Sequence, residues 1–146
     1  MPAYLTPAEL LPHTPPMILI DEVVEYAFPH AAVRLKIRPD SMFVEDGKVP
    51  ALVALEYMAQ ALGIIVGYQS LARGEPIRIG FLLGTRELSL EIDHFDVGDE
   101  LLAEADHLFG DRVLGSFKCT VSRRGQVVAS AQVNAFRSDD EEVPNP

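Results

Sequence analysis

The sequence predicts an α+β fold in which an antiparallel sheet wraps around one long central helix. Residues 50–73 place apolar side chains nearly all round a helix, and such a helix is buried, not laid on a surface. Strand-like segments precede and follow this run, so the elements needed to cover the helix are present in the chain. A sheet of this size leaves an edge strand open, and we expect two copies to pair their edges in a homodimer.

The composition is that of a globular protein. The chain has 146 residues, of which 48% are hydrophobic and 23% charged, and this suits one domain with a sizeable core. We place this single domain at residues 1–137. Residues 138–146 contain four consecutive acidic residues and no apolar periodicity, which is typical of a flexible acidic tail.

Charge and cysteine content exclude several classes of protein. A net charge of −10 argues against non-specific binding to nucleic acid, which depends on basic surface. The one cysteine, Cys119, excludes a disulfide within the chain and favours a reducing, cytoplasmic compartment; we expect it to be buried and inert in a strand. No secretory signal is visible. We expect no membrane span either, because polar residues such as Glu56 and Gln69 interrupt the apolar run.

The N-terminal segment combines a short helical turn with a rigid loop. Thr6 followed by Glu9 has the spacing of a capping box, and Pro7 suits the first helical position, so we expect a turn within residues 3–11. The next stretch is too rich in proline for regular structure and should be a fixed, extended loop. Its sequence is Leu11-Pro12-His13-Thr14-Pro15-Pro16-Met17.

Two strands and a loop should precede the helix. We predict the first strand at residues 18–28 and the second at residues 31–38, where Val33, Leu35 and Ile37 alternate with basic residues. His30, in the connection, is expected to be an exposed turn residue. Residues 39–48 form a loop with a turn signal near Gly47.

The helix itself has clear signals at both ends. Pro50 suits its first turn, and Gly74 with Pro76 should end it at about Arg73. Glu56 and Gln60 interrupt the apolar surface and, being four residues apart, share a face. A carboxylate in such surroundings is costly unless it is paired or used in chemistry.

Strands should fill the rest of the chain. We predict them at residues 77–83, 85–92, 100–108, 113–122 and 126–136, with a short hairpin turn at residues 123–125. Gly84 is expected to mark a bulge or a close backbone approach. His94 and His107 are expected to be structural or exposed.

Few residues are suited to chemistry. There is no phosphate-binding glycine loop, no metal-ligand spacing and no nucleophilic serine motif, so we expect neither a metal nor another cofactor. What remains is His13 in the rigid loop, Glu56 and Gln60 on the helix, and the N–H group of Ala51 at the helix start.

These parts suit the β-elimination of water from a 3-hydroxyacyl thioester. Histidine supplies a base for the proton next to the carbonyl. Glu56 in apolar surroundings would have a raised pKa and could protonate the departing hydroxyl. A helix N-terminus, here at Ala51, offers donors to the enolate oxygen. The alternative is that Glu56 is an ordinary solvated or dimer-facing residue.

Two motifs resemble the 3-hydroxyacyl-[acyl-carrier-protein] dehydratases with the hotdog fold. They are the proline loop around His13 and the helix segment Pro50-Ala51-Leu52-Val53-Ala54-Leu55-Glu56-Tyr57-Met58-Ala59-Gln60. Together with residues 80–88, they are most similar to the divergent dehydratases of aryl polyene pathways. The resemblance extends over roughly residues 10–137. It implies a hotdog dimer with a tunnel at the dimer interface for an acyl chain on phosphopantetheine, and it matches Glu56 to the helix carboxylate of the family.

The chain departs from this family in one loop. Dehydratases of the common type carry a catalytic histidine before the helix, whereas residues 41–50 contain none. We therefore expect His13 of one protomer to take the C2 proton and Glu56 of the other protomer to protonate the hydroxyl. Gln60 would orient Glu56 or line the tunnel. Ala51 replaces a family glycine, and its N–H is expected to remain available as an oxyanion donor.

The resemblance implies an enzyme that dehydrates 3-hydroxyacyl groups on acyl carrier protein, in fatty acid or aryl polyene type biosynthesis. A non-catalytic acyl-thioester-binding protein is the second reading, supported by the missing loop histidine, and a hotdog thioesterase is the third. An acidic carrier protein would need a local basic patch on this acidic chain. The candidates are Lys48, Arg73, Arg78, Arg86, Arg123 and Arg124.

Overall fold

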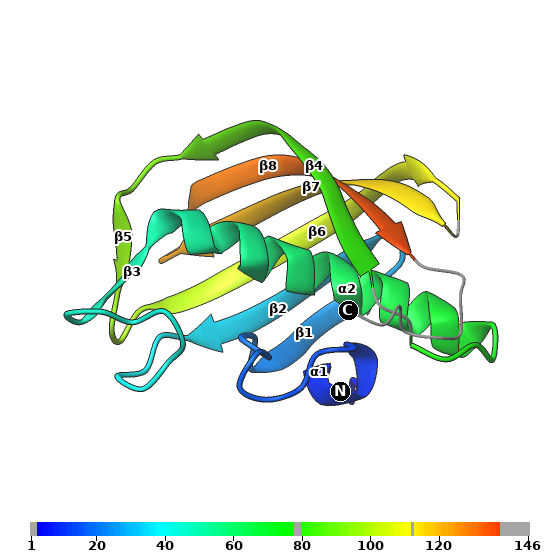
Figure 1. Ribbon diagram of the computed structural model, residues 1–146, viewed down its shortest axis with the longest axis horizontal. Helices are drawn as coiled ribbons and strands as arrows, with labels where there is room; N and C mark the ends of the chain where they lie inside the picture. The colour runs from blue at the N-terminus through cyan, green and yellow to red at the C-terminus, as the bar shows by residue number, and fades with distance from the viewer. Residues whose placement is uncertain (1–2, 78–79, 112, 138–146) are drawn as a thin grey trace, which may run out of the picture.

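The structure is a computed structural model that describes residues 3–77, 80–111 and 113–137. Six antiparallel strands form one sheet in the spatial order β1-β2-β6-β7-β8-β4 (Figure 1). β3 pairs with β5 in a second, two-stranded sheet. The strands are β1 (Glu22–Ala27), β2 (His30–Lys36), β3 (Lys48–Pro50), β4 (Gly80–Leu90), β5 (His94–Asp96), β6 (Glu100–Gly110), β7 (Leu114–Arg123) and β8 (Gln126–Arg137).

The sheet curves around helix α2 (Ala54–Ala72), which follows a short 3-10 helix, η1 (Ala51–Val53) (Figure 1). Met58, Ile64 and Ile65 of α2 are fully buried against the sheet. By length and hydropathy Ala51–Ala72 could also cross a membrane, but here it is the core helix of the domain. The predicted α+β arrangement, a sheet wrapped around one long helix, is confirmed.

The ends of α2 agree with the sequence signals. Gly74 has a positive φ of 69° and its N–H donates to Leu71, while Glu75 N–H donates to Ser70. This is the glycine-terminated end expected just after Arg73. At the N-terminus of the chain, α1 (Pro7–Leu10) begins after Thr6, whose N–H and hydroxyl both donate to the Glu9 carboxylate.

Three strand predictions need correction. β1 begins at Glu22 and not at residue 18, because Leu19 N–H donates to the Gln60 side chain and not to a neighbouring strand. Two separate strands were predicted at residues 77–83 and 85–92, but Gly80–Leu90 forms one strand, β4, whose register shifts at Gly84 as a bulge. The short strands β3 and β5 were not predicted, since three residues carry too little pattern.

His30 is not an exposed turn residue. It opens β2, half-buried, with Nδ1 2.9 Å from Asp106 and Nε2 3.4 Å from Glu104. The two carboxylates lie on β6, the strand that pairs with β2. His30 therefore links two neighbouring strands of the sheet. Its carboxylate partners are distant in sequence, so its position in the chain did not predict them.

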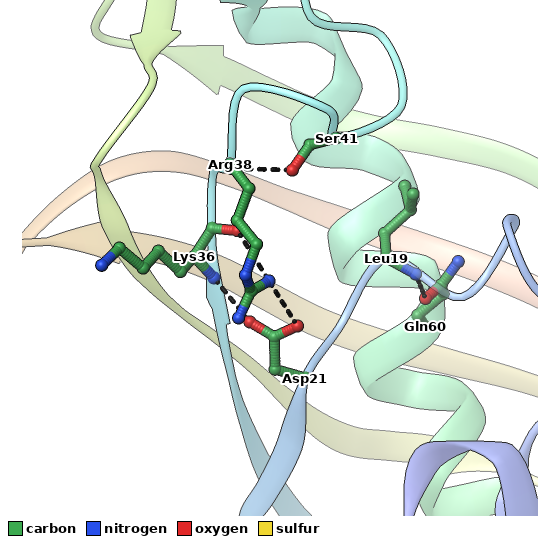
Figure 2. Close-up of polar contacts among 6 residues, drawn as sticks. All are labelled: Leu19, Asp21, Lys36, Arg38, Ser41 and Gln60. Carbon is green, nitrogen blue, oxygen red and sulfur yellow. Dashed lines mark hydrogen bonds and ion pairs between the residues drawn. The ribbon is translucent and has the colours of Figure 1, made fainter.

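A polar cluster secures the end of β2 (Figure 2). The Asp21 carboxylate accepts hydrogen bonds from Lys36 N–H at 2.8 Å and from Arg38 at 3.0 Å. Arg38 N–H in turn donates to the hydroxyl of Ser41 at 2.7 Å. These contacts set the direction in which the loop leaves the sheet towards η1.

Cys119 is fully buried in β7, as expected, and burial raises the pKa of its thiol to about 12. The predicted acidic tail, residues 138–146, lies outside the described residues. The division of the chain into a domain and a tail therefore stays a prediction.

Candidate active site

The site begins with the buried amide of Gln60, which ties the proline-rich loop to α2. Its Oε1 accepts a hydrogen bond from Leu19 N–H at 2.9 Å (Figure 2), and its Nε2 donates to the Met17 carbonyl at 2.8 Å. Nε2 also donates to Glu56 Oε1 at 3.0 Å. Because Oε1 faces an N–H group, the orientation of the amide is determined, and Gln60 acts on the loop and on Glu56 together.

Glu56 and His13 meet at the first turn of α2. His13 Nε2 lies 3.5 Å from Glu56 Oε1, and both side chains are about one-third exposed, at 31% and 32%. His13 Nδ1 is buried and has no hydrogen-bond partner within the described structure. Nε2 is therefore the ring nitrogen that faces the carboxylate and the solvent-accessible side of the pair.

The two side chains belong to one chain. We expected His13 of one protomer to meet Glu56 of its partner, whereas here the two side chains meet within one chain. The segment before β1 folds back over the same helix that carries Glu56, so the pair forms without a second copy. The sequence could not show this, because the direction of a proline-rich loop depends on contacts with distant residues.

The pKa of Glu56 is lowered, not raised as we expected. Burial by itself raises it, but the hydrogen bonds from His13 and Gln60, with the charge of His13, outweigh burial. The apolar residues around the helix suggested the first effect only. The carboxylate is thus ionised at neutral pH, and its Oε1 atom is approached by both Gln60 Nε2 and His13 Nε2.

A cavity of about 160 Å³ adjoins the pair. On α2 it is lined from Glu56 through Ala59, Gly63 and Val66 to Arg73, which form one stripe along the helix. His13 and Glu56 lie together at one end of the cavity, and most of the cavity wall is apolar. Further lining comes from the loop and the sheet, through Leu11, Leu82, His107, Val113, Phe117 and Phe136. The shape suits an extended apolar chain with its reactive end at the pair.

The backbone N–H of Ala51 is not the free donor that we expected. It donates to the carbonyl of Asp93 at 3.0 Å, next to the pairing of β3 with β5. This N–H is therefore not available to an oxyanion. Our expectation that Ala51 would serve as an oxyanion donor was wrong. Asp93 is far away in sequence, so no local pattern predicted the contact.

A second histidine, His107, borders the cavity. It lies between Phe28 and Phe117, with ring centroids 5.5 Å and 5.1 Å away. The sequence suggested only a structural or exposed role for it. No cluster of histidine, cysteine and acidic side chains suited to a metal ion occurs among the residues that the structure describes.

Comparisons with known proteins find relatives over most of the chain. Residues 5–144 match the model of the ApeP-like family, described as ApeP dehydratase. A 3-hydroxyacyl-[acyl-carrier-protein] dehydratase FabZ from Vibrio campbellii is 26% identical over 139 residues, covering 90% of both chains. The corresponding protein from Klebsiella pneumoniae subsp. pneumoniae is 29% identical over 136 residues, covering 89% of both.

Solved structures give the same picture. The dehydratase heterocomplex ApeI:P from Xenorhabdus doucetiae contains a chain that is 29% identical, with a TM-score of 0.89 and 95% of both chains covered. A hypothetical thioesterase from Streptococcus pneumoniae, solved with coenzyme A, is 16% identical with a TM-score of 0.61, covering 83% of this chain and 88% of its own. The second likeness concerns the fold alone. The hotdog fold expected from the sequence is confirmed.

Proposed function

Because the chain belongs to the ApeP-like dehydratase family, we propose that it removes water from a 3-hydroxyacyl thioester on acyl carrier protein and releases the trans-2-enoyl thioester. One observation carries the assignment of the site. His13 Nε2 and Glu56 Oε1 lie 3.5 Å apart at one end of a mainly apolar cavity. An acyl chain would fill the cavity and present its C2 and C3 atoms to the pair.

The reaction needs one proton to move from C2 to the leaving hydroxyl. In our proposal the neutral His13 ring, with its proton on Nδ1, takes the proton from C2 onto Nε2 and the C2 electrons form the double bond to C3. The C3–O bond breaks as a proton reaches the leaving hydroxyl. The ionised Glu56 receives this proton from His13 across their contact and delivers it to the hydroxyl, which leaves as water. The lowered pKa of Glu56 fits this order, because the carboxylate begins the cycle without a proton.

Gln60 is a positioning residue in this proposal. Its buried amide is engaged by Leu19, Met17 and Glu56, so it has little capacity left for substrate. It would keep Oε1 of Glu56 directed at His13. Ala51 has no role in the proposed mechanism, because its N–H donates a hydrogen bond to the carbonyl of Asp93.

The carrier protein would approach from the open side of the cavity. Among the basic candidates, Arg73 lines the cavity, whereas Arg123 is already paired with Asp99 at 3.0 Å. Arg78 lies outside the described residues. We expect Arg73→Glu to raise KM for the acyl carrier protein substrate and to leave KM for a short acyl-pantetheine substrate nearly unchanged; equal effects on both would remove Arg73 from the docking surface.

We also propose that β4 pairs with a second hotdog chain. β4 is an edge strand of the six-stranded sheet and exposes Leu82, Leu83 and Leu88 by 46%, 61% and 40%. Exposed apolar edges of this kind favour association. A homodimer is the simplest assembly, and the similar Xenorhabdus doucetiae structure, which is a dehydratase heterocomplex, supports a different dehydratase chain as the partner. Native mass of the purified protein, compared with Leu83→Lys, distinguishes these assemblies from a monomer.

Intact-mass analysis of a 3-hydroxyacyl carrier protein tests the activity itself. We expect wild type to remove one water from the acyl group, and His13→Ala and Glu56→Gln to lose this activity by roughly a hundredfold or more, the range of general acid–base catalysis. Release of free acid would indicate a thioesterase, and tight binding without mass change would indicate a non-catalytic acyl-binding protein. Full activity in His13→Ala would show that another group is the base.

A further inference from the structure

The N-terminal segment runs along α2 in the opposite direction to the helix. Leu5 N–H donates to the hydroxyl of Tyr68 at 2.9 Å, near the end of α2. Further along the segment, Met17 and Leu19 bond to Gln60, nearer the helix start. His13 lies between these two anchors.

Between the anchors the segment touches α2 at two glycines. A Cβ atom added to Gly63 would lie 2.7 Å from Leu11 Cδ2, closer than real Cβ atoms approach. A Cβ atom added to Gly67 would overlap the backbone carbonyl of Leu10. Neither glycine has a positive φ, so the backbone conformation does not require glycine at either position.

Glycine is an unfavourable residue inside a helix, and two of them four residues apart weaken α2 unless packing requires them. The packing requires both glycines. Gly63 makes room for Leu11, which follows α1, and Gly67 makes room for Leu10, which ends α1. The glycines stand on the same stripe as Glu56 and Gln60, at intervals of three and four residues. One face of α2 thus carries the carboxylate and also receives the segment that carries His13.

We propose that Gly63 and Gly67 are positioning residues, whose missing side chains set the depth at which the N-terminal segment lies on α2 and thereby bring His13 to Glu56. The inference rests on the proposed function for its kinetic consequences. Only Leu11 and Pro12 separate Leu10 from His13, and the proline ring restricts the backbone between them. A shift at Leu10 is therefore passed on to His13, whose contact with Glu56 is already 3.5 Å long.

The two glycines differ in what opposes a methyl group. At Gly63 the obstacle is the end of the Leu11 side chain, which a second substitution removes. At Gly67 it is the Leu10 backbone, which no side-chain substitution removes. We expect Gly67→Ala to lower kcat at least roughly tenfold with KM changed less than about twofold, since small misplacements of catalytic groups act mainly on turnover.

A double-substitution experiment tests the proposal. We expect Gly63→Ala to lower kcat, and the double variant Gly63→Ala/Leu11→Ala to recover to the level of Leu11→Ala alone. In the same Leu11→Ala background, Gly67→Ala should not recover. Wild-type kcat in Gly67→Ala, or equal recovery at both glycines, would overturn the proposal. Gly63→Ala keeps the test valid if Gly67→Ala does not fold.

A second readout does not depend on turnover. The imidazole NMR resonances of His13 should shift on Glu56→Gln in the wild-type background and shift much less in the Gly67→Ala background. If wild type shows no dehydration but this difference is seen, the proposed function fails and the positioning holds. If dehydration is seen and the resonances respond equally in both backgrounds, the positioning fails and the function holds.

Discussion

Replacing Gln60 with methionine removes three hydrogen bonds from the interior and keeps a side chain of similar length. In the variant, Leu19 N–H and the Met17 carbonyl lose their partner, and Glu56 loses one donor. A buried polar group without a partner costs about 1–3 kcal/mol, so two of them predict a loss of about 2–6 kcal/mol. We expect the lower half of this range, because Met17 lies at the surface and is 40% exposed.

Urea unfolding measures this loss, with the slope of the transition checked for constancy. Gln69→Met is the matched control: it makes the same chemical change on the same helix, at a side chain that is only half-buried and makes no hydrogen bond within the described structure. We expect the control to change stability by less than about 0.5 kcal/mol. A Gln60→Met variant as stable as the control would refute the view that this amide holds the loop on α2.

Three further predictions concern titratable groups. The pKa of Glu56 should lie below the ordinary value of a glutamate and should rise in His13→Ala, where burial is opposed by Gln60 alone; carboxyl NMR titration measures this, and an unchanged pKa would contradict the assigned contact. Since its pKa is lowered by folding, the stability that ionised Glu56 contributes is present at neutral pH and is lost as the pH falls through the lowered value, so wild type and Glu56→Gln should converge in stability in acid. Cys119 should resist thiol reagents at pH 8 until the protein unfolds, because its pKa is about 12 and it is fully buried; rapid labelling of native protein would show that β7 opens.

Much of the fold follows from local signals in the sequence. The apolar run of α2 identified the core helix, Gly74 and Pro76 marked its end, alternation marked β2 and β6, and the turn at residues 123–125 marked the β7–β8 hairpin. These features depend on residues that are close together in the chain. The two side chains singled out for chemistry, His13 and Glu56, are also the two that the structure brings to 3.5 Å.

The contacts of the site that escaped prediction depend on distant residues. Gln60 accepts a hydrogen bond from the N–H of Leu19, and β1 is therefore shorter than predicted. The carbonyl of Asp93 accepts a hydrogen bond from the N–H of Ala51, which is therefore not free to bind an oxyanion. The direction of the Glu56 pKa shift depends on His13, which is 43 residues away in sequence, and burial alone suggested the opposite direction. Spacing along the chain carries no information on contacts of this kind.

Subunit mixing tests most directly whether one chain supplies both catalytic groups. His13→Ala and Glu56→Gln chains would be unfolded together and refolded as a mixture, with mixed assemblies verified by native mass spectrometry. Because the structure pairs His13 with Glu56 of the same chain, every site in a mixed assembly lacks one of the two groups, and we expect dehydration of the 3-hydroxyacyl carrier protein to stay at the level of the single variants. Restored dehydration in the mixed assemblies would show that the working site is shared between protomers and would contradict the proposed pair.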